Sequence, residues 1–166
     1  MIKSAVIVDL MWRYRLDRIW APEKGTVAFV MLNPSTADAE QDDATIRRCV
    51  GFAQDWGYGH LVVVNLYGFR ATDPKELKEW IATDEGWAIG RDNGRHVIEV
   101  CRQAQTIVAA WGAHAPEKRV EAMRATFRAL GVRIDCLGYT KGGQPVHPLR
   151  QPKDAMLRKY MWERDA

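Results

Sequence analysis

Hydrogen-bonding and aromatic residues follow four apolar runs of this chain, at the point where each run ends. They are an asparagine after each of the first two runs, a tryptophan after the third and a histidine after the fourth: Asn33, Asn65, Trp111 and His147. Side-chain amides donate and accept hydrogen bonds, and histidine can act as an acid or a base near neutral pH. Together these residues are candidates for an active site.

Each of the four also has a purely structural explanation. Asn33 can bond the backbone of its own turn, and Asn65 can satisfy a neighbouring group at the margin of the core. Trp111 can be a core residue, and His147 can be an ordinary loop residue beside a proline. The functional interpretation is favoured because four successive runs all end in such residues.

The apolar runs predict a parallel sheet. They are rich in valine and isoleucine and do not alternate with polar residues, which is typical of strands buried on both faces. They span residues 27–32, 61–64, 106–110 and 132–137. Residues 12–20 alternate loosely and predict an antiparallel edge strand.

Helical patterns lie between the runs. Asp42 or Asp43 can cap a first helix that ends at Gly57, and Asp73-Pro74 starts a short second one that ends near Thr83. Further helices are expected over 92–103, from Pro116 to Gly131, and over 153–162. The alternation predicts a three-layer α/β/α sandwich around a mainly parallel four-stranded sheet. In such sheets ligands bind beyond the carboxyl ends of the strands, so the four candidates should share one edge.

Composition limits the class of protein. The chain has 166 residues, 47% hydrophobic and 27% charged, which indicates one soluble domain spanning 1–166. No apolar run reaches the roughly 18 residues that span a bilayer, and the N-terminus does not read as a signal peptide. Three cysteines without a CxxC pair predict reduced, buried thiols in a cytoplasmic protein, with neither a metal site nor a cofactor. A net charge of +3 permits nucleic-acid binding without requiring it.

The order of the motifs resembles the uracil-DNA glycosylase superfamily. Asn-Pro follows the first strand, Val-Val-Val-Asn closes the second, Trp-Gly follows the third and His-Pro follows the fourth. More closely, most of the chain, about residues 12–150, is similar to an uncharacterised bacterial and phage family known as a domain of unknown function. The segments that carry this second resemblance are MLNPSTAD, DDATIRR, VVVNLYGFRATDP, AAWGAHA and QPVHPL.

The glycosylase resemblance implies a uracil-DNA glycosylase-like fold and a role for each residue. Asn33 would hold the attacking water, Asn65 would pair with the edge of a flipped pyrimidine, and His147 would donate a hydrogen bond to the base oxygen. The other residues implied in substrate binding hold phosphate or shape the pocket: Pro34, Ser35, Trp111, Gly142, Gly143 and Arg150. Leu149 would be the apolar wedge that enters the base stack.

Three features depart from that pattern. Leu149 and Arg150 follow His-Pro where the superfamily has a serine, and the stacking aromatic residue has no clear counterpart among Phe52, Tyr67 and Phe69. The segment 38–43 is acidic, so Asp42 or Asp43 is an alternative general base, or a ligand for a sugar hydroxyl or a metal ion.

Three functions therefore stay open. The first is a nucleobase-directed hydrolase that acts on a nucleic acid or a nucleotide. The second is a non-catalytic module that binds a nucleotide or a modified base. The third is a structural or interaction protein that uses some of the seven tryptophans as a partner face. The oligomeric state is not predicted.

Overall fold

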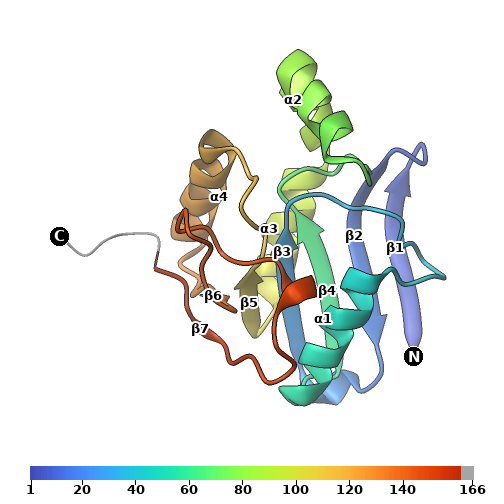
Figure 1. The fold of residues 1–166 in the computed structure, drawn as a ribbon. Coiled ribbons are helices and arrows are strands. Elements are labelled where there is room, and N and C mark those ends of the chain that lie inside the picture. The colour runs from blue at the N-terminus through green and yellow to red at the C-terminus, as the bar shows by residue number, and fades with distance from the viewer. Residues whose placement is uncertain (162–166) are drawn as a thin grey trace.

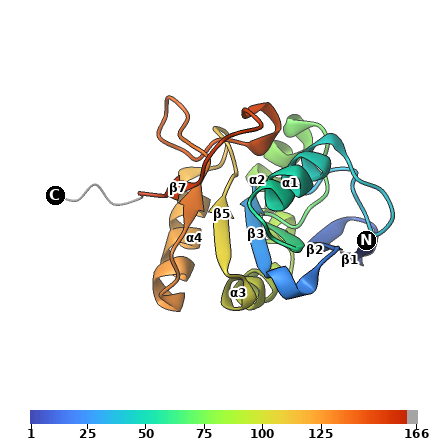
Figure 2. The same cartoon turned by 90° about the horizontal axis from the view of Figure 1, so that it is seen from below.

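The computed structural model describes residues 1–161 and contains one mixed sheet (Figure 1). Its strands are β1 (Ile2–Val8), β2 (Trp12–Ile19), β3 (Thr26–Met31), β4 (His60–Asn65), β5 (Thr106–Ala109), β6 (Asp135–Cys136) and β7 (Arg158–Lys159). They lie in the order β1-β2-β4-β3-β5-β6-β7, with β1 and β7 at opposite ends of the array (Figure 2).

The centre of the sheet contains the strands expected from the apolar runs. β3 is parallel to both β4 and β5, and β5 is parallel to β6. β2 is antiparallel to β4, as expected, but it is not an edge strand because β1 pairs with its other side. The fold is therefore α/β with a mixed sheet of seven strands, larger than the sheet predicted.

The helix predicted over 153–162 is wrong for the part that the structure describes. Residues 158–159 form β7, which pairs antiparallel with β6. Tyr160 continues this pairing, because its backbone N–H donates to the carbonyl of Ile134 at 2.9 Å. The helical pattern of this segment is weak, and hydrogen bonds to the free edge of β6 stabilise a strand there instead. Trp162 lies outside the described residues.

Helices cover both faces of the sheet. They are α1 (Ala44–Asp55), α2 (Pro74–Ile89), α3 (Asn93–Gln103) and α4 (Glu117–Leu130), with short 3-10 turns at Pro22–Lys24 and Pro148–Arg150. α1 lies in front of the strands in Figure 1 and α3 lies behind them. One apolar cluster joins α1 to the sheet, and a second joins α2, α3 and α4 to the other face. None of the helices in residues 1–161 could cross a bilayer, since none combines enough length with enough apolar character.

Local signals account for several helix ends. Asp43 caps α1 by accepting a hydrogen bond from the N–H of Ile46, and Asp73 caps α2 with Pro74 in its first turn. Gly131 ends α4 in the left-handed region, with φ 65°. α2 continues past the predicted end near Thr83, but Asp84 there has non-helical dihedrals and kinks the helix.

Candidate functional site

A small polar cavity opens beyond the carboxyl end of β3, on the face of the sheet that α1 covers. Its volume is about 170 Å³. The polar side chains that line it come from β2, from the loops after β3 and β4, from α1 and its N-cap, and from the loop after β6: Arg13, Asn33, Ser35, Asp43, Thr45, Thr72 and His147. Asn33, Ser35, Asp43 and His147, all predicted from the sequence, are thus brought together.

Asn33 has its amide nitrogen engaged by the backbone. Nδ2 donates to the carbonyls of Ala71 at 2.9 Å and of Pro34 at 3.0 Å. These two carbonyl oxygens fix the orientation of the amide, because a flipped amide would place its own oxygen against them. Oδ1 is consequently left as an acceptor for a water molecule or a ligand. The structural explanation of Asn33 holds for its nitrogen, while its oxygen is available for chemistry.

His147 is held as a neutral hydrogen-bond donor. Its Nδ1 accepts a hydrogen bond from the N–H of Leu149 at 3.3 Å, at the start of the Pro148–Arg150 turn. A ring that accepts at Nδ1 carries its proton on Nε2. Burial lowers the pKa of His147, and the nearby carboxylate of Asp43 opposes that shift. The ring is therefore neutral near pH 7 and offers its Nε2–H group.

Asn65 lies beneath the cavity and does not line it. Its side chain is 0% exposed, and neither its Nδ2 nor its Oδ1 has a hydrogen-bond partner among residues 1–161. It pairs in parallel register with Met31, so the two side chains point to the same face of the sheet. β4 lies between β2 and β3, which contribute Arg13 and Met31 to the cavity wall. A buried amide without partners is costly, so this position calls for an explanation by function.

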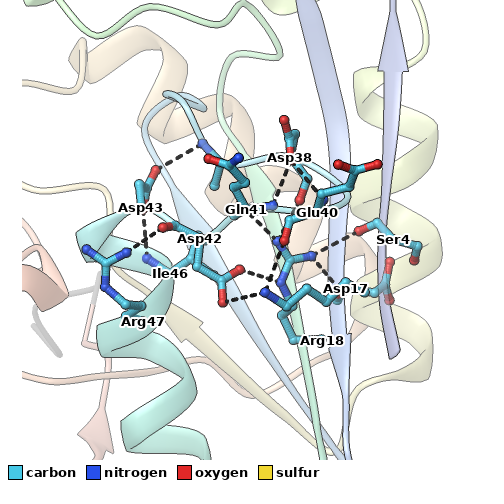
Figure 3. Close-up of polar contacts among 12 residues, drawn as sticks. Ser4, Asp17, Arg18, Asp38, Glu40, Gln41, Asp42, Asp43, Ile46 and Arg47 are labelled. Carbon is cyan, nitrogen blue, oxygen red and sulfur yellow. Dashed lines mark hydrogen bonds and ion pairs between the residues drawn. The ribbon is translucent and has the colours of Figure 1, made fainter. Parts of the chain in front are cut away.

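Most of the acidic side chains of residues 38–43 form hydrogen bonds or ion pairs with neighbouring groups of the protein (Figure 3). Arg18 Nε lies 2.6 Å from Asp42 Oδ1, and Lys3 Nζ lies 3.3 Å from Asp42 Oδ2. Asp38 accepts hydrogen bonds from the N–H groups of Glu40 and Gln41, which hold the pKa of Asp38 below its ordinary value.

Only Asp43 of this run lines the cavity, and it also has structural partners. Its carboxylate accepts from the N–H of Ile46 at 2.9 Å and from the N–H of Ala37 at 3.4 Å. The acidic residues, which are the feature of the sequence least suited to DNA binding, therefore serve mainly to hold this loop in its folded conformation. Asp42 is a structural residue, since its carboxylate forms ion pairs within the fold. Asp43 lines the cavity and can therefore contact a ligand.

Several other predicted residues lie elsewhere. Trp111 is 1% exposed, donates its indole N–H to Gln144 at 2.8 Å and packs edge-on against Tyr160. Gly142 and Gly143 form the tip of a hairpin closed by Thr140 and Gln144. Pro34 is buried and serves the cavity indirectly, since its carbonyl accepts from Asn33. Arg150 and Leu149 are exposed on the turn that follows His147.

Among residues 1–161, no phenylalanine, tyrosine or tryptophan side chain lines the cavity. Phe52 is packed in the cluster beneath α1, while Tyr67 and Phe69 lie in the cluster on the opposite face of the sheet. The apolar part of the lining comes from Met31, Ile46 and Ala71. A planar ligand in this cavity would therefore rest on aliphatic side chains.

The family described as a protein of unknown function, DUF1643, matches residues 13–149. The chain belongs to this family. No curated protein and no solved structure matches it. The DUF1643 segment contains every residue that lines the cavity, whereas β1 and β7 lie outside it. The candidate site thus lies wholly within the segment that the family model matches.

Arg13 is the charged lining residue that sequence reasoning missed, and the polar lining residues Thr45 and Thr72 were not predicted either. In an edge strand, the alternation of Trp12, Tyr14 and Leu16 would leave Arg13 facing solvent. In the structure Arg13 is 2% exposed, because β1 covers one side of β2 and the loop after β3 covers its face. The signal that could have identified Arg13 is a charged residue in a predicted strand whose neighbours are apolar or aromatic.

Proposed function

We propose that this DUF1643 protein recognises a nucleobase in the cavity at the end of β3 and hydrolyses the bond between that base and its sugar. The observation that carries the proposal is that Asn33 and His147, from separate loops, line one cavity, with the buried amide of Asn65 beneath it. The order of the motifs along the chain supports a fold related to the uracil-DNA glycosylases.

In the proposed reaction, the C1′–N bond breaks with its electron pair on the base. The Nε2–H of His147 donates to a base oxygen, where negative charge grows, and one such donor contributes about 3 kcal/mol to transition-state stabilisation. A neutral ring suits this role because it gives a hydrogen bond without losing its proton. The buried environment that lowers the pKa of His147 supports this state.

Asn33 would position the nucleophile. Its Oδ1 accepts a hydrogen bond from water, whose oxygen then bonds to C1′ as the base leaves, and the proton released from the water passes to solvent or to the departing base. Asn33 orients the water without deprotonating it, which suffices when the sugar has the oxocarbenium-like character known from glycoside hydrolysis. A cavity of about 170 Å³ is small compared with the roughly 300–1,000 Å³ of drug-sized sites, and it suits a single base.

The test is release of free base from single- and double-stranded DNA that contains uracil, mismatched thymine or modified pyrimidines, and from the matching nucleotides. His147→Ala should slow release about 100-fold, since it removes one charge-stabilising donor. His114→Ala is the matched control, because His114 is exposed in the loop after β5 and lines the adjoining cavity, which shares Asn33 but not His147 with this one. Absence of release from every substrate, or release unaffected by His147→Ala, refutes the proposal.

A second candidate is a binding module without turnover. It is favoured by one observation: Asp43, the carboxylate in the cavity, already accepts two backbone hydrogen bonds and is poorly placed to take a proton from water. In this case a nucleotide would bind without being cleaved, and binding would survive Asn33→Ala. A salt titration separates the ligands, since contact with several DNA phosphates makes affinity fall steeply with salt.

A further inference from the structure

Arg13 and Arg18 are two arginines of the same strand with very different surroundings. Both side chains are buried, at 2% and 0% exposure, and both tether the loop after β3 by donating to its carbonyls. Arg18 also has a carboxylate partner, Asp42, at 2.6 Å. Arg13 has no ion pair within residues 1–161, although it lines the cavity.

The guanidinium of Arg13 has hydrogen-bonding capacity that the fold does not use. A guanidinium carries five N–H donors, and here one nitrogen, Nη1, donates to the carbonyl of Ala37 at 2.7 Å. Nε is buried and has no partner in the described part of the chain. Arg18, by contrast, donates from Nε, Nη1 and Nη2 to acceptors in its own strand and in the loop.

The charge of Arg13 has no ion-pair partner among residues 1–161, although the carboxylate of Asp43 lines the same cavity. Burial lowers its pKa to about 10, and the carboxylate of Asp43 opposes that shift. Arg13 therefore remains protonated near pH 7. Asp43 directs its own oxygens to the N–H groups of Ile46 and Ala37. A buried cation with so few acceptors is expensive to maintain for structure alone, since a neutral side chain could tether one carbonyl.

We infer that Arg13 is a specificity-determining residue that binds an acceptor oxygen of the ligand in this cavity. The inference rests on the proposed function in taking that ligand to be a nucleobase, and it names the class: bases with exocyclic oxygens, above all those that carry or develop negative charge. Amino groups at the same positions would point their N–H bonds at a buried cation. Arg13 would then select oxo-pyrimidines over amino-pyrimidines and add its charge to the hydrogen bond from His147.

Calorimetric binding of free bases tests the inference separately from catalysis. The probes are barbiturate, which is an anionic oxo-pyrimidine at neutral pH, uracil, and 2,4-diaminopyrimidine, in which amino groups replace both oxygens of uracil. Arg13→Gln should lower the affinity for barbiturate by about 10- to 100-fold, the loss expected for a hydrogen bond to a charged group, and should remove most of the preference over the diamine.

Arg70→Gln is the matched control. Arg70 also donates to carbonyls of the loop after β3, those of Ser35 and Thr36, but it does not line the cavity. Its replacement should change the affinity for all three probes by one common factor. If Arg13→Gln does not fold, as judged by thermal unfolding, Arg13→Lys keeps the charge without the fork of donors and should reduce the preference partially.

The outcomes are distinct. An equal loss for all three probes in Arg13→Gln, or no binding of any probe to the wild-type protein, overturns the inference. Base release from DNA that continues in either case leaves the proposed function standing. Binding of barbiturate that depends on Arg13, without base release from any substrate, supports the inference and refutes the hydrolase.

Discussion

Replacement of Asp42 by asparagine should reveal how much of the fold depends on the acidic loop. Asp42 Oδ1 lies 2.6 Å from Nε of Arg18, whose side chain is 0% exposed, and the side chain of Asp42 is 15% exposed. Asp42→Asn keeps the shape but leaves the buried guanidinium without its counter-charge. Loss of one partner of a buried pair costs about 3–5 kcal/mol, and because asparagine still accepts one hydrogen bond, we expect a loss of about 3 kcal/mol. The weaker pair with the exposed Lys3 adds about 0–1 kcal/mol.

Urea unfolding followed by tryptophan fluorescence measures this loss. The matched control is Glu40→Gln, which removes a charge from the same loop at an exposed side chain that makes no ion pair among residues 1–161. The control should stay within about 0.5 kcal/mol of the wild-type protein. A difference of less than about 1 kcal/mol between the two variants would show that Asp42 is not the structural partner of Arg18, and the acidic run would return as a candidate for catalysis.

Three further measurements follow from the structure. Burial lowers the pKa of His147 below 6.5, so that the unfolded chain takes up a proton at this residue first as the pH falls. The contribution of His147 to the free energy of unfolding is therefore full above about pH 6.5 and declines below it. Urea unfolding of His147→Gln should show a smaller decline between about pH 7 and pH 5 than the wild-type protein. Gly59→Ala would place a Cβ 1.5 Å from the carbonyl oxygen of Ala21 and should lower the free energy of unfolding by more than about 4 kcal/mol. Gly51→Ala, in a helix with no atom within 4 Å of the new Cβ, should raise it by about 1 kcal/mol. Equal melting temperatures of the two variants would contradict both expectations. The three cysteines are buried, so a thiol reagent should label none of them in the native protein and all three in urea, and rapid native labelling would refute their burial.

The sequence was most informative where structure depends on neighbours along the chain. The valine-rich runs before Asn33 and Asn65 identify β3 and β4, because strands buried on both faces need apolar residues at every position. Asp43, Asp73 and Gly131 mark helix ends because capping satisfies backbone groups within one turn of the cap. The order of strands and helices then sufficed for the α/β class.

Prediction was poorer at the margins of the sheet. β1 and β7 were not predicted as strands, since neither has a strong pattern of its own and each is stabilised by hydrogen bonds to a partner strand. The kink at Asp84 was not predicted either: the carboxylate of Asp84 accepts from the N–H of Trp87, Trp80 stacks on Trp87 across the kink at 3.8 Å, and Phe69, from the loop after β4, packs on Trp87. Such pairings cannot be read from a local pattern.

The candidate site divides in the same way. The sequence alone predicted that Asn33 and His147 follow strands and that both lie at one edge of the parallel part of the sheet. Only the tertiary structure decided that Arg13 faces the same cavity, that the amide of Asn65 lies beneath it without partners, and that Asp42 is held by Arg18. The physical reason is that the environment of a polar group is set by the surfaces that close over it, and here those surfaces come from residues far apart in the chain.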